Sequence, residues 1–83
     1  MKTLKDLKEM KNESCIPFGT QYEYFFAGLE DYYIAKSDGV ERIKVELKNW
    51  DKEAQFFIVN ELANRISESG IMEFDKKEIL SLI

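Results

Sequence analysis

The dipeptide Asp38-Gly39 constrains the fold more strongly than any other feature of the sequence. Asp-Gly between two runs rich in aromatic and β-branched residues is typical of a two-residue hairpin turn. A turn at this position pairs Ile34 with Ile43 across two antiparallel strands. We therefore predict a hairpin whose strands span residues 32–36 and 40–47.

The second strand of this hairpin supports the predicted register. Its apolar residues alternate with charged ones, as in a strand that buries one face. The inward set is Ile43, Val45 and Leu47. Residues 21–27 are rich in Tyr and Phe, which favour a pleated surface, and they predict one more strand. Together these segments predict a three-stranded antiparallel β-meander.

The position of the aromatic side chains depends on the loop between the first two strands. One extra loop residue turns every side chain of a strand to the other face. A four-residue loop places Tyr22, Tyr24 and Phe26 beside Tyr33, on the face away from Ile43. A three-residue loop turns Tyr24 and Phe26 into the core. We favour the four-residue loop.

Two helices flank the predicted sheet. The first spans about residues 4–11, with Thr3 as its N-cap and Asp6 as the capping-box partner. The second spans residues 52–69 and ends at Gly70. Its apolar residues recur at helical spacing, so we expect it to cover the inward side of the sheet.

A short third helix is predicted to begin at Asp75, where Glu78 completes a capping box. A helix this short and apolar is not stable alone, so it must dock on the rest of the chain. It covers either Phe57 or the aromatic face of the sheet, so the tyrosines there are either buried or partly exposed. The predicted fold is a single α+β domain, residues 1–83, in the order αβββαα.

The residue types exclude several classes of function. The chain has no histidine and one cysteine, so we expect no metal site, no cofactor and no Cys-His nucleophile. Cys15 fits a small buried apolar residue. The carboxylates near the hairpin ends have no nucleophile or glycine-rich cradle beside them. We therefore expect that the protein is not an enzyme.

Charge and hydropathy indicate the kind of partner and the compartment. Sixteen acidic and twelve basic residues leave a net charge of −4, which disfavours nucleic acid and favours a basic partner. The longest apolar run, residues 56–59, is too short to cross a membrane. The lysine-rich start lacks the apolar stretch of a signal peptide. We expect a cytoplasmic protein.

These observations predict a protein-interaction module that blocks or bridges a macromolecular partner. Tyrosine offers a large contact area at little entropic cost, and a few such residues dominate interface energies. The predicted anchors are Tyr22, Tyr24, Tyr33 and Phe57, and the predicted acidic contacts are Glu30, Asp31, Asp38 and Glu41. A structural or antitoxin-like subunit and a homodimer remain open alternatives.

The predicted order helix, three strands, helix over residues 4–69 resembles the double-stranded RNA-binding domain. That family holds phosphates with a lysine cluster at the start of its second helix. Here the matching stretch, residues 51–55, has Lys52 as its only base. The resemblance implies nucleic-acid binding as an alternative function, and this departure counts against it.

The full predicted order, with the short last helix, resembles some small phage-encoded anti-CRISPR proteins in topology, size and charge. Such proteins occupy the DNA-binding surface of an effector nuclease. The resemblance implies an inhibitor that acts inside a bacterial or phage-infected cell and contacts a nucleic-acid-binding effector, without binding nucleic acid itself.

Overall fold

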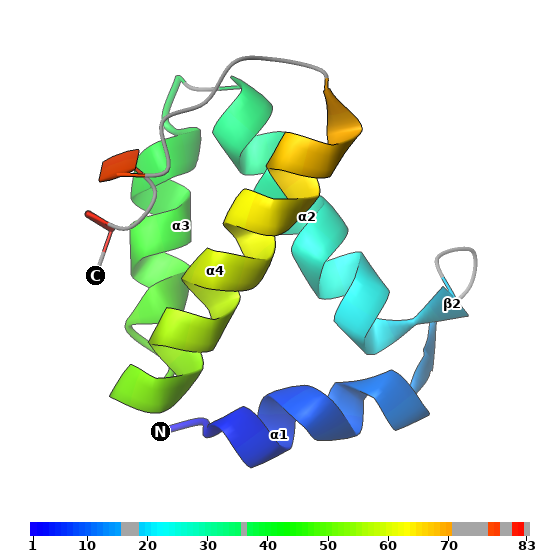
Figure 1. Ribbon diagram of the computed structural model, residues 1–83. Helices are drawn as coiled ribbons and strands as arrows, with labels where there is room; N and C mark the ends of the chain where they lie inside the picture. The colour runs from blue at the N-terminus through cyan, green and yellow to red at the C-terminus, as the bar shows by residue number, and fades with distance from the viewer. Residues whose placement is uncertain (16–18, 36, 71–76, 79–80, 83) are drawn as a thin grey trace.

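The computed structural model describes residues 1–15, 19–35, 37–70, 77–78 and 81–82, and it is mainly helical. Its long helices pack against one another, and in the view of Figure 1 α4 crosses in front of α2, with α3 to the left. In chain order the elements are α1 (Leu4–Glu9), the 3₁₀ turn η1 (Met10–Asn12), β1 (Ser14–Cys15), β2 (Gly19–Thr20), α2 (Gln21–Ala35), α3 (Gly39–Leu47) and α4 (Lys52–Ser69).

The predicted αβββαα fold, with its three-stranded meander, is wrong. Residues 21–27 and most of 32–36 belong to the single helix α2, and residues 40–47 lie in α3. Within the described residues, β structure is limited to the two-residue antiparallel pair of β1 with β2 and one isolated bridge between Lys2 and Trp50. Ile34 and Ile43 are therefore not cross-strand neighbours.

The physical reason is a helical period in the aromatic stretch. Tyr22, Phe26, Leu29 and Tyr33 recur at i, i+4, i+7 and i+11, which places them on one face of a helix. All four are buried. Thr20 caps this helix, since its Oγ1 accepts a hydrogen bond from the Glu23 amide at 3.2 Å. The helical spacing of the four buried residues and the N-cap at Thr20 together outweigh the preference of aromatic residues for strands, which depends on context.

Asp38-Gly39 begins a helix and does not form a hairpin turn. Asp38 is the N-cap of α3, and its carbonyl accepts the Arg42 amide at 3.1 Å. A Cβ added to Gly39 would clash with the backbone carbonyl of Tyr32 on α2. Glycine is therefore needed here because two helix backbones approach closely.

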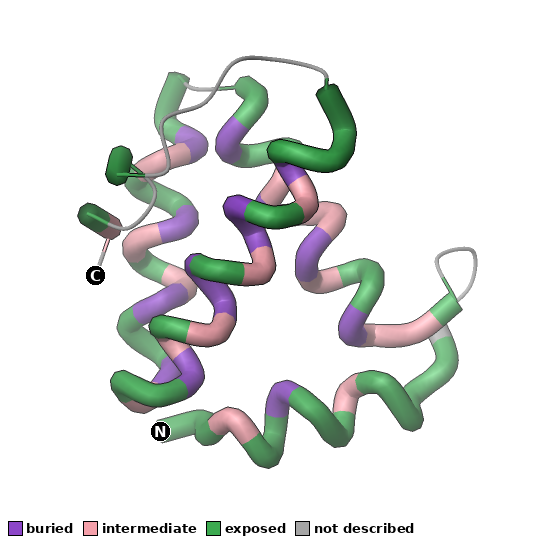
Figure 2. Tube along the Cα trace, in the orientation of Figure 1, coloured by how far each residue is buried: buried purple, intermediate pink, exposed green. Residues whose placement is uncertain are grey.

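The burial pattern of α3 follows four-residue spacing. Ile43 and Leu47 are buried, whereas Val45 is 61% exposed. The predicted inward set was therefore right for two residues and wrong for Val45. Figure 2 shows the buried positions of α2, α3 and α4 facing the centre of the molecule.

The two predicted flanking helices are confirmed, although α1 ends at Glu9, where η1 follows, and α4 packs on α2 and α1 instead of on a sheet. Thr3 and Asp6 form the expected capping box at the start of α1. Helix α4 spans Lys52–Ser69, begins where Asp51 Oδ1 accepts the Ala54 amide at 2.9 Å, and ends at Gly70 in the left-handed conformation. Its buried face forms the largest part of the core, with Ala54, Ile58, Val59, Leu62, Ala63 and Ile66.

The corner between α3 and α4 is held by polar contacts around a buried tryptophan. Trp50 is 1% exposed. The Lys2 amide donates to the Asn49 carbonyl at 2.9 Å, and the Lys2 carbonyl accepts the Asp51 amide at 2.8 Å. The side-chain amide of Gln55 donates to the Trp50 carbonyl at 3.0 Å. This corner therefore fixes where α3 ends relative to α1 and α4.

The predicted last helix falls largely outside the described residues, including its capping residue Asp75. Of that segment, the Ser81 amide donates to the Lys77 carbonyl at 2.9 Å, as in a helical turn. Leu82 packs against the core. The predicted burial of Cys15 likewise falls outside what the structure describes.

Candidate functional site

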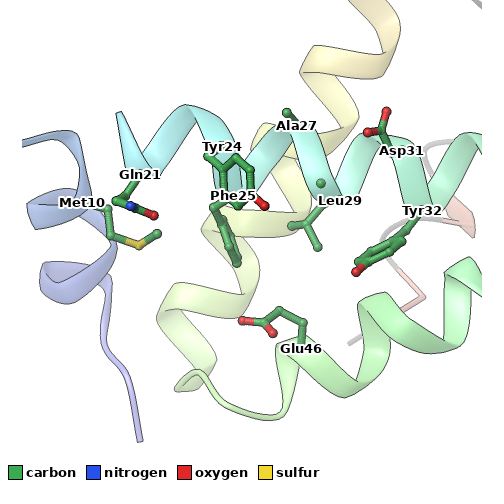
Figure 3. A pocket seen from close by; sticks show the side chains of 10 residues that line it. Met10, Gln21, Tyr24, Phe25, Ala27, Leu29, Asp31, Tyr32 and Glu46 are labelled. Atoms are coloured by element: carbon green, nitrogen blue, oxygen red, sulfur yellow. The ribbon is translucent and has the colours of Figure 1, made fainter. Parts of the chain in front are cut away.

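A groove of about 570 Å³ lies between α2 and α3, with η1 at one end. The residues that line it include Met10, Gln21, Tyr24, Phe25, Tyr32 and Glu46, and we call it the α2–α3 groove. Figure 3 shows Phe25, Leu29 and Tyr32 extending from α2 toward the side of Glu46, whereas Ala27 and Asp31 point the other way. The groove therefore has an apolar wall on α2 and a carboxylate on α3.

The α2 wall is a second helical stripe beside the buried one. Gln21, Phe25, Gly28 and Tyr32 recur at i, i+4, i+7 and i+11, so they share one face of α2. All four line the groove. Because α2 buries one stripe in the core, the neighbouring stripe is left for the groove.

Aromatic packing holds the inner wall of the groove in place. The Phe25 ring lies 5.2 Å from that of Phe26 in an edge-to-face arrangement and 5.6 Å from the Trp50 ring. Ring pairs at these distances attract one another beyond their buried area. Trp50 also donates from Nε1 to Glu46 Oε1 at 3.2 Å. The tryptophan thus orients both the aromatic wall and the carboxylate.

The groove continues past Tyr32 into a shallower depression of about 350 Å³, which shares Tyr32 and Glu46 with it. Val45, 61% exposed, lies in this depression. Arg42 crosses it, with its guanidinium 5.6 Å from the centre of the Tyr32 ring and its Nε 3.1 Å from Asp38 Oδ2. The two hollows form one continuous surface along α2 and α3.

Large apolar side chains on this surface are accessible to solvent. Tyr24 is 51% exposed and Tyr32 37% exposed. Together with Val45 they are three of the six exposed large hydrophobic residues that the structure describes. Scattered exposed apolar residues are ordinary, but residues gathered around one groove indicate a contact site.

Carboxylates outnumber cations along this surface. Asp31, Asp38, Glu41 and Glu46 line the two hollows, and Arg42 is the one base among their lining residues. The hydrogen bond from Arg42 lowers the pKa of the Asp38 carboxyl, so Asp38 is charged at neutral pH.

Two of these carboxylates have no ion-pair partner in the part of the chain that the structure describes. Glu41 Oε1 lies 3.5 Å from Lys44 Nζ, and Asp38 pairs with Arg42. Among the described residues, no lysine or arginine forms an ion pair with Asp31 or Glu46. Among the described residues, the groove therefore places negative charge that no ion pair neutralises beside an apolar wall.

The predicted aromatic anchors have different positions in the structure. Tyr22 and Tyr33 are core residues, 4% and 1% exposed, and do not lie on a surface. Tyr24 lines the groove. Phe57 is partly buried and packs against the core, whereas its neighbour Phe56 is 50% exposed. The shared face that was predicted for Tyr22, Tyr24, Phe26 and Tyr33 does not exist.

Among the predicted acidic contacts, Asp31, Asp38 and Glu41 lie at the groove or its extension, but Glu30 does not line either hollow. Burial raises the pKa of the Glu30 carboxyl, with the negative charges of Asp31, Glu23 and Glu61 adding to the effect and Arg65 opposing it.

The charges that act on Glu30 include those of Glu23, Glu61 and Arg65, which form an ion-pair network between α2 and α4. Arg65 donates to Glu23 Oε2 at 3.0 Å and to Glu61 Oε1 at 3.2 Å. Its guanidinium also lies 4.9 Å from the centre of the Phe26 ring. Glu23 and Glu61 already use this cation, so we assign the network to holding α4 on α2.

Sequence reasoning missed the residues that make the groove. Phe25, Gly28 and Tyr32 were assigned to a strand or loop, and Glu46 to the face of a strand that points away from Ile43. The signal that finds the first three is the i, i+4, i+7, i+11 stripe next to the core stripe. No sequence signal brings Glu46 to that stripe, because the contact depends on how α3 packs on α2.

Within the described residues no group of three or more possible ligand side chains can hold a metal ion. No described helix is long and apolar enough to span a membrane. Comparisons with protein-family models, curated proteins and solved structures give no match for this chain. The functional argument therefore rests on the groove itself.

Proposed function

We propose that the protein is a protein-interaction module that binds an amphipathic segment of another protein in the α2–α3 groove and thereby blocks or bridges that partner. The observation that carries the proposal is the coincidence of exposed apolar side chains with uncompensated carboxylates along one groove. Tyr24, Tyr32 and Val45 are accessible there, and Asp31 and Glu46 lack a cation within the described chain.

Binding explains these residues better than catalysis does. The groove holds carboxylates and tyrosines, and the chain has no histidine. A general acid or base works beside a nucleophile or an oxyanion-binding group, and the groove's lining residues form no such set. We therefore propose a role without chemistry of its own.

A protein partner is also favoured over nucleic acid. Phosphate backbones are bound by clustered lysine and arginine side chains, whereas four of the five charged residues described along the groove and its extension are acidic. The resemblance to the double-stranded RNA-binding domain rested on three strands that the structure replaces with helices. Aromatic side chains lining a groove with a polar rim fit the usual anatomy of a protein interface.

The inhibitor role is part of this proposal. The resemblance to anti-CRISPR proteins rested on the order αβββαα, which is wrong, so size and acidity are what remain of it. An acidic groove still suits a basic surface of a nucleic-acid-binding effector. A cytoplasmic site of action belongs to the same proposal, and cell fractionation tests it.

Two matched variants test the proposed binding site. Tyr24 and Phe56 are exposed to the same extent, 51% and 50%, but only Tyr24 lines the groove. The tagged wild-type chain, Tyr24→Ala and Phe56→Ala are used to capture proteins from the source cells, with quantitative mass spectrometry. We expect a partner that Phe56→Ala retains and that Tyr24→Ala loses at least about tenfold.

The purified partner then separates blocking from bridging. An inhibitor lowers the partner's own activity, such as DNA cleavage by a nuclease, and Tyr24→Ala restores that activity. If Tyr24→Ala and Phe56→Ala capture every protein equally well, the α2–α3 groove is not the binding site and the proposal fails.

A further inference from the structure

We infer that the occupant of the α2–α3 groove is a basic amphipathic helix whose backbone approaches α2 over Gly28 and whose cations reach Glu46 and Asp31. This inference rests on the proposed function and specifies the chemistry of the partner. Three features of the groove carry it: an unused glycine, the length of the α2 stripe and the balance of charge.

Gly28 lies in the interior of α2, where glycine destabilises a helix relative to alanine. At Gly39 the fold explains the glycine, because a Cβ would clash with the Tyr32 backbone. At Gly28 a Cβ would meet nothing within 4 Å. The chain's own described packing therefore does not use the space that the missing side chain leaves.

That space opens into the groove. Gly28 lines it and occupies the middle of the stripe, between Phe25 and Tyr32. A glycine flanked by two aromatic side chains makes a notch in which another backbone can approach closely. Close approach of two helices needs small residues at the crossing point, and a helix entering this notch would meet the Phe25 and Tyr32 rings on either side.

The length of the stripe suits a short helix. Gln21 and Tyr32 are eleven residues apart in α2, and at 1.5 Å per residue the stripe is about 16 Å long. A partner helix of about three turns covers this length. Apolar anchors at i, i+3 or i+4, and i+7 are the usual way in which a helix occupies a groove.

Charge decides which kind of helix fits. Glu46 is held toward Trp50 by one carboxylate oxygen, Oε1, and Asp31 lines the groove from α2 and points away from the Glu46 side. Neither has an ion-pair partner among the described residues. Lysine or arginine side chains beside the apolar stripe of the partner would pair with them, whereas an acidic helix would meet like charge.

The same charges disfavour a second copy of this chain as the occupant. Two protomers that meet groove to groove would place the carboxylates of Asp31 and Glu46 against those of their partner. Like charges across an interface oppose association, and the chain as a whole carries a net charge of −4. A separate basic partner is the better fit.

A peptide-display selection tests this inference directly. The probe is a library of 14-residue helical peptides with randomised surface positions, selected against the full-length chain. We expect the enriched sequences to carry an apolar stripe, a small residue at its centre, and lysine or arginine beside it. The enriched peptides are then synthesised, and their affinities are measured for the wild-type chain, for Gly28→Ala, Glu46→Gln and Tyr24→Ala, and for the control Asn64→Ala.

The first variant, Gly28→Ala, separates binding from stability. Filling the notch should raise the melting temperature by about 2 to 8 °C, because alanine favours the helix, and weaken peptide binding about tenfold. If Gly28 had only a structural role, its substitution would not raise the melting temperature and at the same time lower the peptide affinity. Asn64→Ala on α4 is the matched control, since it raises helix propensity at an exposed position outside the groove and should leave binding unchanged.

The second variant, Glu46→Gln, tests the charge. Its amide oxygen can still accept from Trp50, so the fold is kept while the negative charge is removed. We expect basic peptides to bind three- to tenfold more weakly, an effect that shrinks at high salt. Melting temperature should not change by more than a few degrees.

The outcomes separate this inference from the proposed function. One outcome is that the enriched peptides are neutral or acidic, while their affinity still falls in Gly28→Ala and Tyr24→Ala. This outcome overturns the inference of a basic helix but keeps the groove as a binding site. Peptides whose affinity is the same for wild type, Gly28→Ala and Tyr24→Ala overturn both. No enrichment over an unrelated acidic control protein also overturns both.

Discussion

The close approach of α2 and α3 at Gly39 gives the sharpest stability prediction. In Gly39→Ala the added methyl group would clash with the Tyr32 carbonyl carbon and oxygen and would lie 3.1 Å from its Cα. These are backbone atoms, so a rotamer change cannot relieve the clash and the two helices must separate. Such overpacking costs about 1 to 3 kcal/mol.

The preference of alanine over glycine inside helices offsets little of this cost, because Gly39 is the first residue of α3. The net loss of about 1 to 3 kcal/mol lowers the melting temperature of a domain this small by at least about 4 °C. Thermal unfolding followed by far-UV circular dichroism measures it. Gly28→Ala adds the same methyl group to open space in α2 and serves as the control, with an expected rise.

A melting temperature for Gly39→Ala that equals or exceeds that of the wild type would refute the reasoning. It would mean that the α2–α3 contact is looser than the structure shows, and the groove between these helices would lose its defined shape. A fall in both Gly39→Ala and Gly28→Ala would show that Gly28 is also constrained within the chain, contrary to the open space around it.

Four further predictions follow from burial and charge. Tyr33→Ala, in the core, should lower the melting temperature by at least about 10 °C, whereas Tyr24→Ala should change it by less than about 4 °C. Arg65→Met removes the ion pairs between α2 and α4 and should cost about 1 kcal/mol, less at high salt. Burial raises the pKa of Glu30 in the folded state, so folding disfavours its charged form. Glu30→Gln should therefore raise the melting temperature at neutral pH, and this gain should fade as the pH falls from the raised folded-state pKa toward the ordinary pKa of 4.5, below which it is absent. In a gel-shift assay at physiological salt the protein should leave duplex DNA and RNA unshifted, because its net charge is −4.

Local capping chemistry was enough to predict α1 and α4. Thr3 with Asp6, and Gly70 after a long amphipathic run, mark helix ends through hydrogen bonds that involve only a few neighbouring residues. Such signals do not depend on the rest of the fold, and for that reason these two helices were found with nearly the right bounds.

N-capping signals also precede α2 and α3, but in the prediction other sequence patterns were given more weight. Thr20 is followed after three residues by Glu23, and Asp38 by Glu41, which is the spacing of a helix start. The density of Tyr and Phe favoured a strand, and Asp-Gly favoured a turn. Aromatic residues also fill helical cores, so only their four-residue spacing distinguishes the two structures.

The candidate site was only partly predictable for a related reason. Tyr24 and Asp31 were predicted as contact residues and do line the groove, because polar or amphipathic side chains of this kind are exposed in the predicted fold and in the observed one. Tyr22 and Tyr33 differ from Tyr24 only in their position around α2, which a strand model assigns wrongly. The opposite wall, with Glu46, comes from the packing of α3 on α2, and no local pattern contains that information.

The most direct test of the account is to map the binding surface by NMR. A ¹⁵N-labelled chain is titrated with the tightest peptide from the display selection, and amide shifts are followed residue by residue. The account predicts the largest changes at Tyr24, Gly28, Tyr32 and Glu46, with little change at Asn60 on α4. Shifts that concentrate around Asn60 while the groove amides stay unchanged would contradict it.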